Sequence, residues 1–137
     1  MEIKAAISAG ELFDKISVLD IKLDNLEDRH YSAHGPSPEA RRAIANVEKE
    51  RALLLDIAEV IWKPGLDRLL ADLKRVNLLI WDAVDALHVE DRKWLRNPWK
   101  LARLARTIYV ENDSRAAIKR EINEFLKSEI VEEKLYL

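Results

Sequence analysis

Apolar residues recur along this chain at spacings of three and four, the period of one face of an α-helix. The first such face follows Ser8 and carries Leu12, Ile16, Leu19, Leu23 and Leu26. Ser8 followed three residues later by Glu11 has the spacing of a capping box, which predicts a helix start there. We expect this helix to end near Tyr31, because Gly35-Pro36 cannot continue it.

Two further long helices follow. Ser37-Pro38 supplies an N-cap and a first helical residue, so the second helix is expected to run to about Trp62. Pro64-Gly65 breaks the chain, and a third helix is expected from about Leu66 to Leu87. The end of the second helix is apolar nearly all round, which predicts more than one neighbour for Leu53, Leu55, Ile57 and Val60.

Polar residues interrupt two of these apolar faces. Arg51 falls on the face of the second helix, so its side chain must reach solvent or find a carboxylate. Asn77 falls on the face of the third helix, where a lone amide often fixes the register between helices. We leave open whether Asn77 meets Arg51 or a backbone group.

The last third of the chain predicts two shorter helices. Residues 88–97 are polar and are expected to form a loop, and Asn97-Pro98 opens the fourth helix. Residues 111–113 offer a cap for a fifth helix from about Ser114 to Ser128, followed by a docked or free tail. The sequence therefore predicts a single all-α domain over residues 1–137, with about five helices, three long ones forming an antiparallel hairpin or bundle and two shorter C-terminal ones.

Composition narrows the function classes. The 137 residues carry a formal net charge of −2, which gives no global electrostatic case for binding nucleic acid or anionic membrane. The absence of cysteine excludes thiolate metal sites and cysteine nucleophiles. No apolar run reaches the roughly 20 residues of a spanning helix, and no leader is evident, so we expect a cytoplasmic protein.

The first candidate site is a polar cluster that opens the first helix. Glu11, Lys15 and Lys22 share one helical face, with Asp14 beside them, so a carboxylate and two ammonium groups could converge on a ligand. Two acids in a first turn also complement the helix dipole, and Glu11 with Lys15 is an ordinary surface pair. Both interpretations stay open.

The second candidate site lies near the C-terminus. Arg115, Lys119 and Asn123 recur every four residues on one helical face and suit a carboxylate or phosphate. The exposed amides of the predicted helix start would add to this preference for anions. The alternative is a structural role, with Asp113 as a cap and Arg115 paired with Glu111.

Two strings resemble the ends of a family of short all-helical bacterial proteins, a domain of unknown function. They are GELFDKI at 10–16 with LDIK at 19–22, and YVENDSRAAIKREIN at 109–123, and SEIVEEK at 128–134 fits as well. The resemblance covers about a third of the chain and implies a link to surface polysaccharide biosynthesis, because its members occur near such genes. Its matching polar positions are Glu11, Asp14, Lys15, Lys22, Asn112, Asp113, Arg115, Lys119, Arg120, Glu121 and Asn123.

A third feature is a basic run between residues 92 and 106, which holds six cations, Trp94 and Trp99 and no acid. It carries +6 in fifteen residues, so the rest of the chain carries −8. The run suits a phosphate backbone, anionic lipid or an acidic partner, or else forms a solvated helix face. His30 and His34 have the spacing of a helical metal pair, but the following Gly35-Pro36 and the lack of a third ligand argue against a metal.

Two functions from different classes follow. The first is a non-enzymatic helical interaction or scaffold protein, for which a further protein partner is possible. We expect it to form a homodimer, because apolar stripes on two sides of long helices leave surface for a second copy. The second is an enzyme or binding protein for an anionic metabolite, with Glu11, Lys15, Lys22, Arg115 and Lys119 as its site. We expect no cofactor and no metal, and nucleic acid ranks last. A close approach of the two polar clusters in one pocket would favour the second function.

Overall fold

The computed structural model describes residues 1–30 and 35–135, which form four helices. They are α1 (Ala9–His30), α2 (Pro38–Ile61), α3 (Leu66–Asp91) and α4 (Pro98–Leu126). The all-α class predicted from the periodicity is confirmed, whereas the expected five helices are four. None of the described helices is both long enough and apolar enough to cross a membrane.

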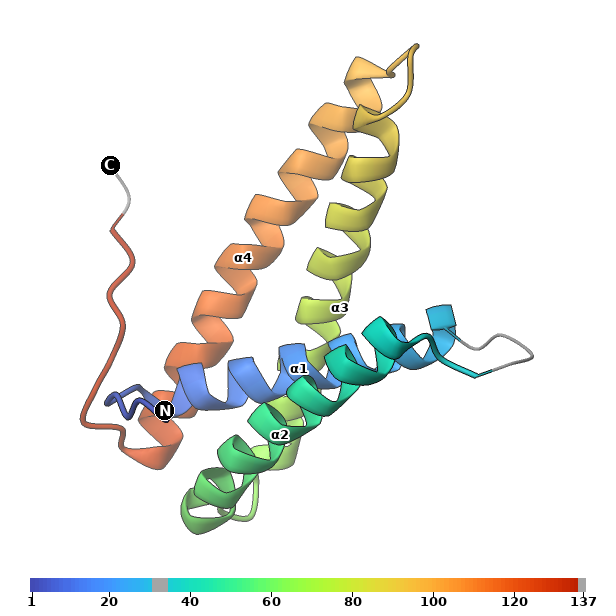
Figure 1. The fold of residues 1–137 in the computed structure, drawn as a ribbon. Coiled ribbons are helices and arrows are strands. Elements are labelled where there is room, and N and C mark those ends of the chain that lie inside the picture. The colour runs from blue at the N-terminus through green and yellow to red at the C-terminus, as the bar shows by residue number, and fades with distance from the viewer. Residues whose placement is uncertain (31–34, 136–137) are drawn as a thin grey trace.

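The helices form two antiparallel hairpins that cross (Figure 1). The α3/α4 hairpin is the longer, and α1 packs across its base against both helices. Helix α2 packs mainly on α1, so the far half of the α3/α4 hairpin projects away from the other two helices (Figure 1). The core lies where the hairpins cross and is built from Leu12, Phe13, Ile16, Ala58, Leu66, Leu73 and Ile122.

Three helix starts lie where the side chains predicted them. The Ser8 hydroxyl accepts a hydrogen bond from the Glu11 backbone N–H at 3.0 Å and caps α1. Ser37 and Asn97 cap α2 and α4 in the same way, and each is followed by proline. These starts were readable because capping depends on residues within one turn.

Two predicted boundaries are wrong. Helix α3 continues through residues 88–91, which were expected to be loop, because no glycine or proline interrupts them and Glu90 is buried. Helix α4 runs unbroken through residues 111–114, so the predicted fifth helix is its second half. Asn112 donates to the Ile108 carbonyl oxygen at 2.9 Å, a bond made four residues back within a continuing helix rather than a cap.

The remaining polar interruptions find different partners. Arg51 pairs with Asp20 of α1, which agrees with the expected carboxylate. Among the described residues, the Asn77 side chain meets neither Arg51 nor a backbone group, and it lies instead among polar side chains of α1 and α4. On α2, Leu55 is partly buried, but Leu53, Ile57 and Val60 are exposed in the single chain, contrary to the expected burial.

Candidate functional site

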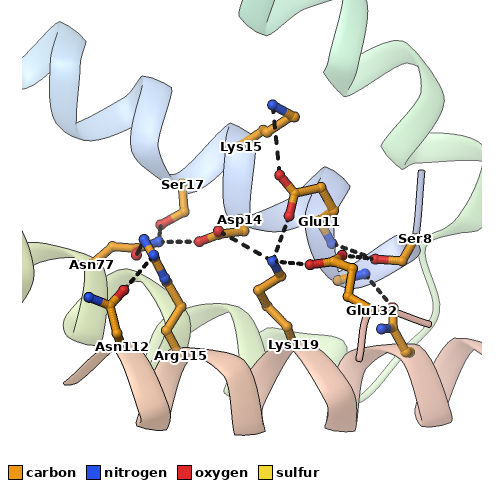
Figure 2. Close-up of polar contacts among 12 residues, drawn as sticks. Ser8, Glu11, Asp14, Lys15, Ser17, Asn77, Asn112, Arg115, Lys119 and Glu132 are labelled. Carbon is orange, nitrogen blue, oxygen red and sulfur yellow. Dashed lines mark hydrogen bonds and ion pairs between the residues drawn. The ribbon is translucent and has the colours of Figure 1, made fainter. Parts of the chain in front are cut away.

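The two polar ends of the chain meet where α1 crosses α4. Lys119 of α4 points at α1 and places its Nζ 2.5 Å from Glu11 Oε2 and 3.9 Å from Asp14 Oδ2 (Figure 2). The same Nζ lies 2.7 Å from Glu132 Oε2 of the C-terminal tail. Three carboxylates from two segments far apart in sequence therefore surround one ammonium group.

Asn77 of α3 occupies the centre of a second set of contacts (Figure 2). Its buried amide donates to Asp14 Oδ1 at 2.8 Å and to the Ser17 hydroxyl at 3.2 Å. Its carbonyl oxygen accepts from Arg115 Nη1 at 3.5 Å, and Arg115 Nη2 donates to Asn112 Oδ1 at 2.5 Å. Asn77 thus links three helices. We call the whole set the polar junction: Glu11, Asp14, Ser17, Asn77, Asn112, Arg115, Lys119 and Glu132.

Gly10 allows the two helices to approach this closely. A Cβ added at Gly10 would lie 2.5 Å from the backbone carbonyl oxygen of Lys119, far inside van der Waals contact. The Gly10 backbone N–H donates to Asn123 Oδ1 at 2.6 Å, and both residues are buried. An unused amide at the start of α1 is therefore satisfied by a side chain of α4.

The C-terminal tail closes the junction from outside. The Ser8 hydroxyl, which caps α1, also donates to Glu132 Oε1 at 2.6 Å. The Ala9 backbone N–H donates to the Ser128 hydroxyl at 3.2 Å. Two more ion pairs tie the tail to α4: Arg120 with Glu133 at 3.7 Å, and Lys134 with Asp113. The described part of the tail, up to residue 135, is therefore docked on α1 and α4.

The charges of the junction stabilise each other's ionised forms. Burial by itself would lower the pKa of Lys119, but its hydrogen bonds to Glu11 and Glu132 outweigh burial and raise that pKa. Burial would raise the pKa of Glu132, but the bonds from Lys119 and Ser8 prevail and lower it. Lys119 is consequently a firmly protonated cation at neutral pH, unsuited to act as a base or a nucleophile.

A cavity of about 370 Å³ opens beside the junction. Five of the predicted site residues line it, together with tail residues: Asn112, Arg115, Lys119, Arg120 and Asn123. Lys119 and Arg120 could bind an anionic ligand there only in competition with tail carboxylates, since Glu132 already lies on Lys119 and Glu133 on Arg120. Arg115 is bound instead to the amide oxygens of Asn77 and Asn112.

Most of the predicted site residues come together, and some do not. Glu11, Asp14, Asn112, Arg115, Lys119 and Asn123 all lie in or next to the junction. Lys15 is exposed and lies 3.7 Å from Glu11, which is the ordinary surface pair that the spacing allowed. Among the described residues, Lys22 forms no contact with the junction and is exposed.

Sequence reasoning missed three residues of the junction. Asn77 stood out as a polar interruption, but its partners lie 63 and 38 residues away and cannot be read from helical spacing. Ser17 gave no signal, because a serine beside an apolar face is common. Glu132 lay in a tail whose docking the pattern left open.

The basic run forms the free end of the α3/α4 hairpin. Buried Glu90 accepts from Lys93 Nζ at 2.7 Å, from the Asn97 backbone N–H at 3.0 Å and from Lys100 Nζ at 3.2 Å. The hydrogen bond from Lys93, then those from Asn97 and Lys100, lower the pKa of Glu90 to about 2 against the effect of burial. The loop at the end of the hairpin is therefore held by one carboxylate.

The described residues contain no group of three or more histidines or carboxylates placed to hold a metal ion. His34 of the considered histidine pair lies outside the described residues. Comparison with known protein families, curated proteins and solved structures finds no match to this chain. The resemblance of the two ends of the chain to a helical family therefore stays a prediction.

Proposed function

We propose that this protein is a non-enzymatic helical interaction protein that works as a homodimer through α2. The observation that carries the proposal is the exposed apolar stripe at the end of α2. Leu53, Ile57 and Val60 recur at spacings of four and three and are 44%, 54% and 83% exposed. A stripe of this kind is characteristic of a helix that pairs with another helix.

The occupant of this stripe is a second copy of the chain. If two α2 helices pair in antiparallel fashion so that Leu53 lies against Val60 of the second copy, the flanking charges also match. Glu50 lies one turn before Leu53 on α2, and Lys63 lies two residues beyond the end of α2 at Ile61, so Glu50 of each copy would lie near Lys63 of the other. Both side chains are exposed, and the arrangement is symmetric, as a two-fold interface requires.

The surface next to the stripe suits this pairing. A cavity of about 820 Å³ lies between the N-terminal segment and α2, lined in part by Ile3, Ile7, Leu53 and Ile57. The second copy would cover this apolar cavity together with the stripe. The polar junction then has a structural role, since it fixes the α1/α2 hairpin that carries the interface onto the α3/α4 hairpin.

Sedimentation velocity tests the proposal. The wild type is expected to sediment at twice the 15.9 kDa of one chain at micromolar concentration. Ile57→Glu should give the monomer, because a charge would be buried in the centre of the interface. Val89→Glu is the matched control, since Val89 is 59% exposed and lies on α3 away from α2. A monomeric wild type, or dissociation by both variants alike, would exclude the interface.

A second candidate function rests on the cavity beside the junction. The two polar clusters do approach each other, and Arg115, Lys119 and Arg120 face one cavity of about 370 Å³. An anionic small molecule bound there would displace the tail carboxylates, Glu132 first. This function keeps the runner-up position because each of these cations already has an acceptor.

A thermal-shift screen against anionic metabolites tests this second function. Nucleotide sugars belong in the screen because the resemblance implies surface polysaccharide biosynthesis. A ligand at 100 times its dissociation constant adds about 2.7 kcal/mol of stability. Under this function Arg115→Ala abolishes the shift, whereas Lys15→Ala, on the exposed side of Glu11, retains it. If no compound stabilises the wild type, this function is rejected.

A further inference from the structure

The free end of the α3/α4 hairpin exposes large apolar side chains at its apex. Trp94 is fully exposed, and Leu95 and Trp99 are 85% and 86% exposed. They lie at the end that projects away from α1 and α2 (Figure 1). Three neighbouring large apolar side chains with so little cover are unusual on a protein surface and indicate an interaction surface.

Cations surround this apex. Lys93, Arg96 and Lys100 lie next to it and are paired with Glu90 or Asp91. Trp99, Arg103 and Arg106 recur at spacings of four and three on α4, so the two arginines continue the face that begins with Trp99. Arg92 is the C-cap residue of α3 on the other side of the loop. We name Arg92, Trp94, Leu95, Trp99, Arg103 and Arg106 the tip surface.

The loop that presents the apex is held in place. Glu90 is only 2% exposed and binds a backbone N–H and two ammonium groups of the loop and of α4. The loop that carries exposed Trp94 and Leu95 is therefore anchored on both sides, to Glu90 through the Lys93 side chain and through the Asn97 N–H.

We propose that the tip surface binds the surface of an anionic lipid bilayer. Tryptophan prefers the level of the lipid headgroups, because its apolar ring can leave water there while its N–H group remains solvated. Leucine gains by entering the acyl boundary, and a collar of arginines is attracted by anionic headgroups. The protein would be held at the bilayer by its tip, with no helix crossing it.

The shape of the tip favours lipid over nucleic acid. Single-stranded nucleic acid binds in positively charged grooves where bases stack on aromatic side chains. Here Trp94 lies on the loop and Trp99 in the first turn of α4, both at the projecting end of the hairpin, and exposed Leu95 next to Trp94 has no role in stacking. A convex apolar point inside a basic collar is better suited to insertion among headgroups. This surface is separate from the α2 stripe, so the inference does not depend on the homodimer.

Vesicle co-sedimentation of the full chain tests the proposal. The protein is mixed with phosphatidylcholine vesicles that contain either no phosphatidylglycerol or about one third phosphatidylglycerol. We expect binding to the anionic vesicles, weakened by salt, and little binding to the neutral ones. Arg103→Gln should weaken binding about fivefold, the value of one charge near an anionic surface. Arg41→Gln, an exposed arginine on α2, should leave binding unchanged.

The apolar contribution has a closely matched control. Leu95 and Leu135 are each 85% exposed, but only Leu95 lies at the tip. Leu95→Ser should weaken vesicle binding by about tenfold, and Leu135→Ser should not change it. Circular dichroism checks that both variants keep the helical fold. Equal losses for the two variants, equal binding to neutral vesicles, or binding to a mixed-sequence oligonucleotide without binding to anionic vesicles would each overturn the proposal.

Discussion

Replacing Gly10 with alanine is expected to destabilise the protein by about 2 kcal/mol, because the added methyl group collides with the backbone of α4. The new Cβ would lie 2.5 Å from the Lys119 carbonyl oxygen and 3.0 Å from its Cα. Backbone atoms in the middle of a helix cannot move aside as a flexible side chain can. The two helices must separate, which also lengthens the 2.6 Å bond from Gly10 N–H to Asn123.

Whether Gly10→Ala lowers or raises the free energy of unfolding shows whether α1 and α4 are in close contact. Alanine is the better helix former, by up to about 1 kcal/mol in a helix interior, so at a position without tertiary contacts Gly10→Ala would be neutral or stabilising. Urea unfolding at one fixed protein concentration measures the difference. Asn123→Ala and the double variant complete a cycle, and we expect the two losses to be less than additive because both act on one contact. A stabilising Gly10→Ala would show that α1 and α4 are not in this close contact.

Replacing Asn77 with leucine is expected to destabilise the protein by about 3 kcal/mol. The change removes the hydrogen-bond partner of Asp14 and Ser17 on α1 and of Arg115 on α4, which are buried or partly buried. Asp14 loses its 2.8 Å bond, and Arg115 loses its 3.5 Å contact with α3. Leucine has nearly the right volume, so the loss reports polar contacts rather than a cavity. Urea unfolding again gives the value.

Two comparisons separate this effect from a general preference for leucine. Asn46→Leu, at an exposed position of α2, should change stability by less than about 0.5 kcal/mol. The double variant Asp14→Leu with Asn77→Leu should recover part of the lost stability. In it the buried Asp14 carboxylate, which Asn77→Leu alone leaves without its amide partner, is also removed. If Asn77→Leu is as stable as the wild type, Asn77 does not organise the junction.

Local features of the fold could be predicted from the sequence, and distant ones could not. The caps at Ser8, Ser37 and Asn97 act within one turn, and all three helices start where these residues indicated. The polar residues at 111–114 have the composition of a helix boundary, but in the continuous α4 Asn112 binds Arg115 and Asp113 binds Lys134 of the tail. Residue type alone cannot distinguish these two reasons for polarity.

The candidate site was predicted in its residues but not in its arrangement. The polar ends supplied Glu11, Asp14, Arg115 and Lys119, while the residue that joins them, Asn77, lies in the middle of the chain. The crossing angle of the two hairpins decides which residues meet, and it depends on packing at the core and on Gly10. Lys22 was expected in the cluster because it shares a helical face with Glu11, but it is exposed and has no contact with the junction among the described residues.

The most direct test of the proposed homodimer is a charge exchange across α2, followed by sedimentation equilibrium. Glu50→Lys and Lys63→Glu, each alone, should weaken the dimer, since each places like charges opposite each other. The double variant should restore the dissociation constant to near that of the wild type, because the exchanged charges again attract. A double variant that is weaker than both single variants, or a wild type that stays monomeric, would contradict an antiparallel α2 interface and with it the account of this protein as a dimeric interaction protein.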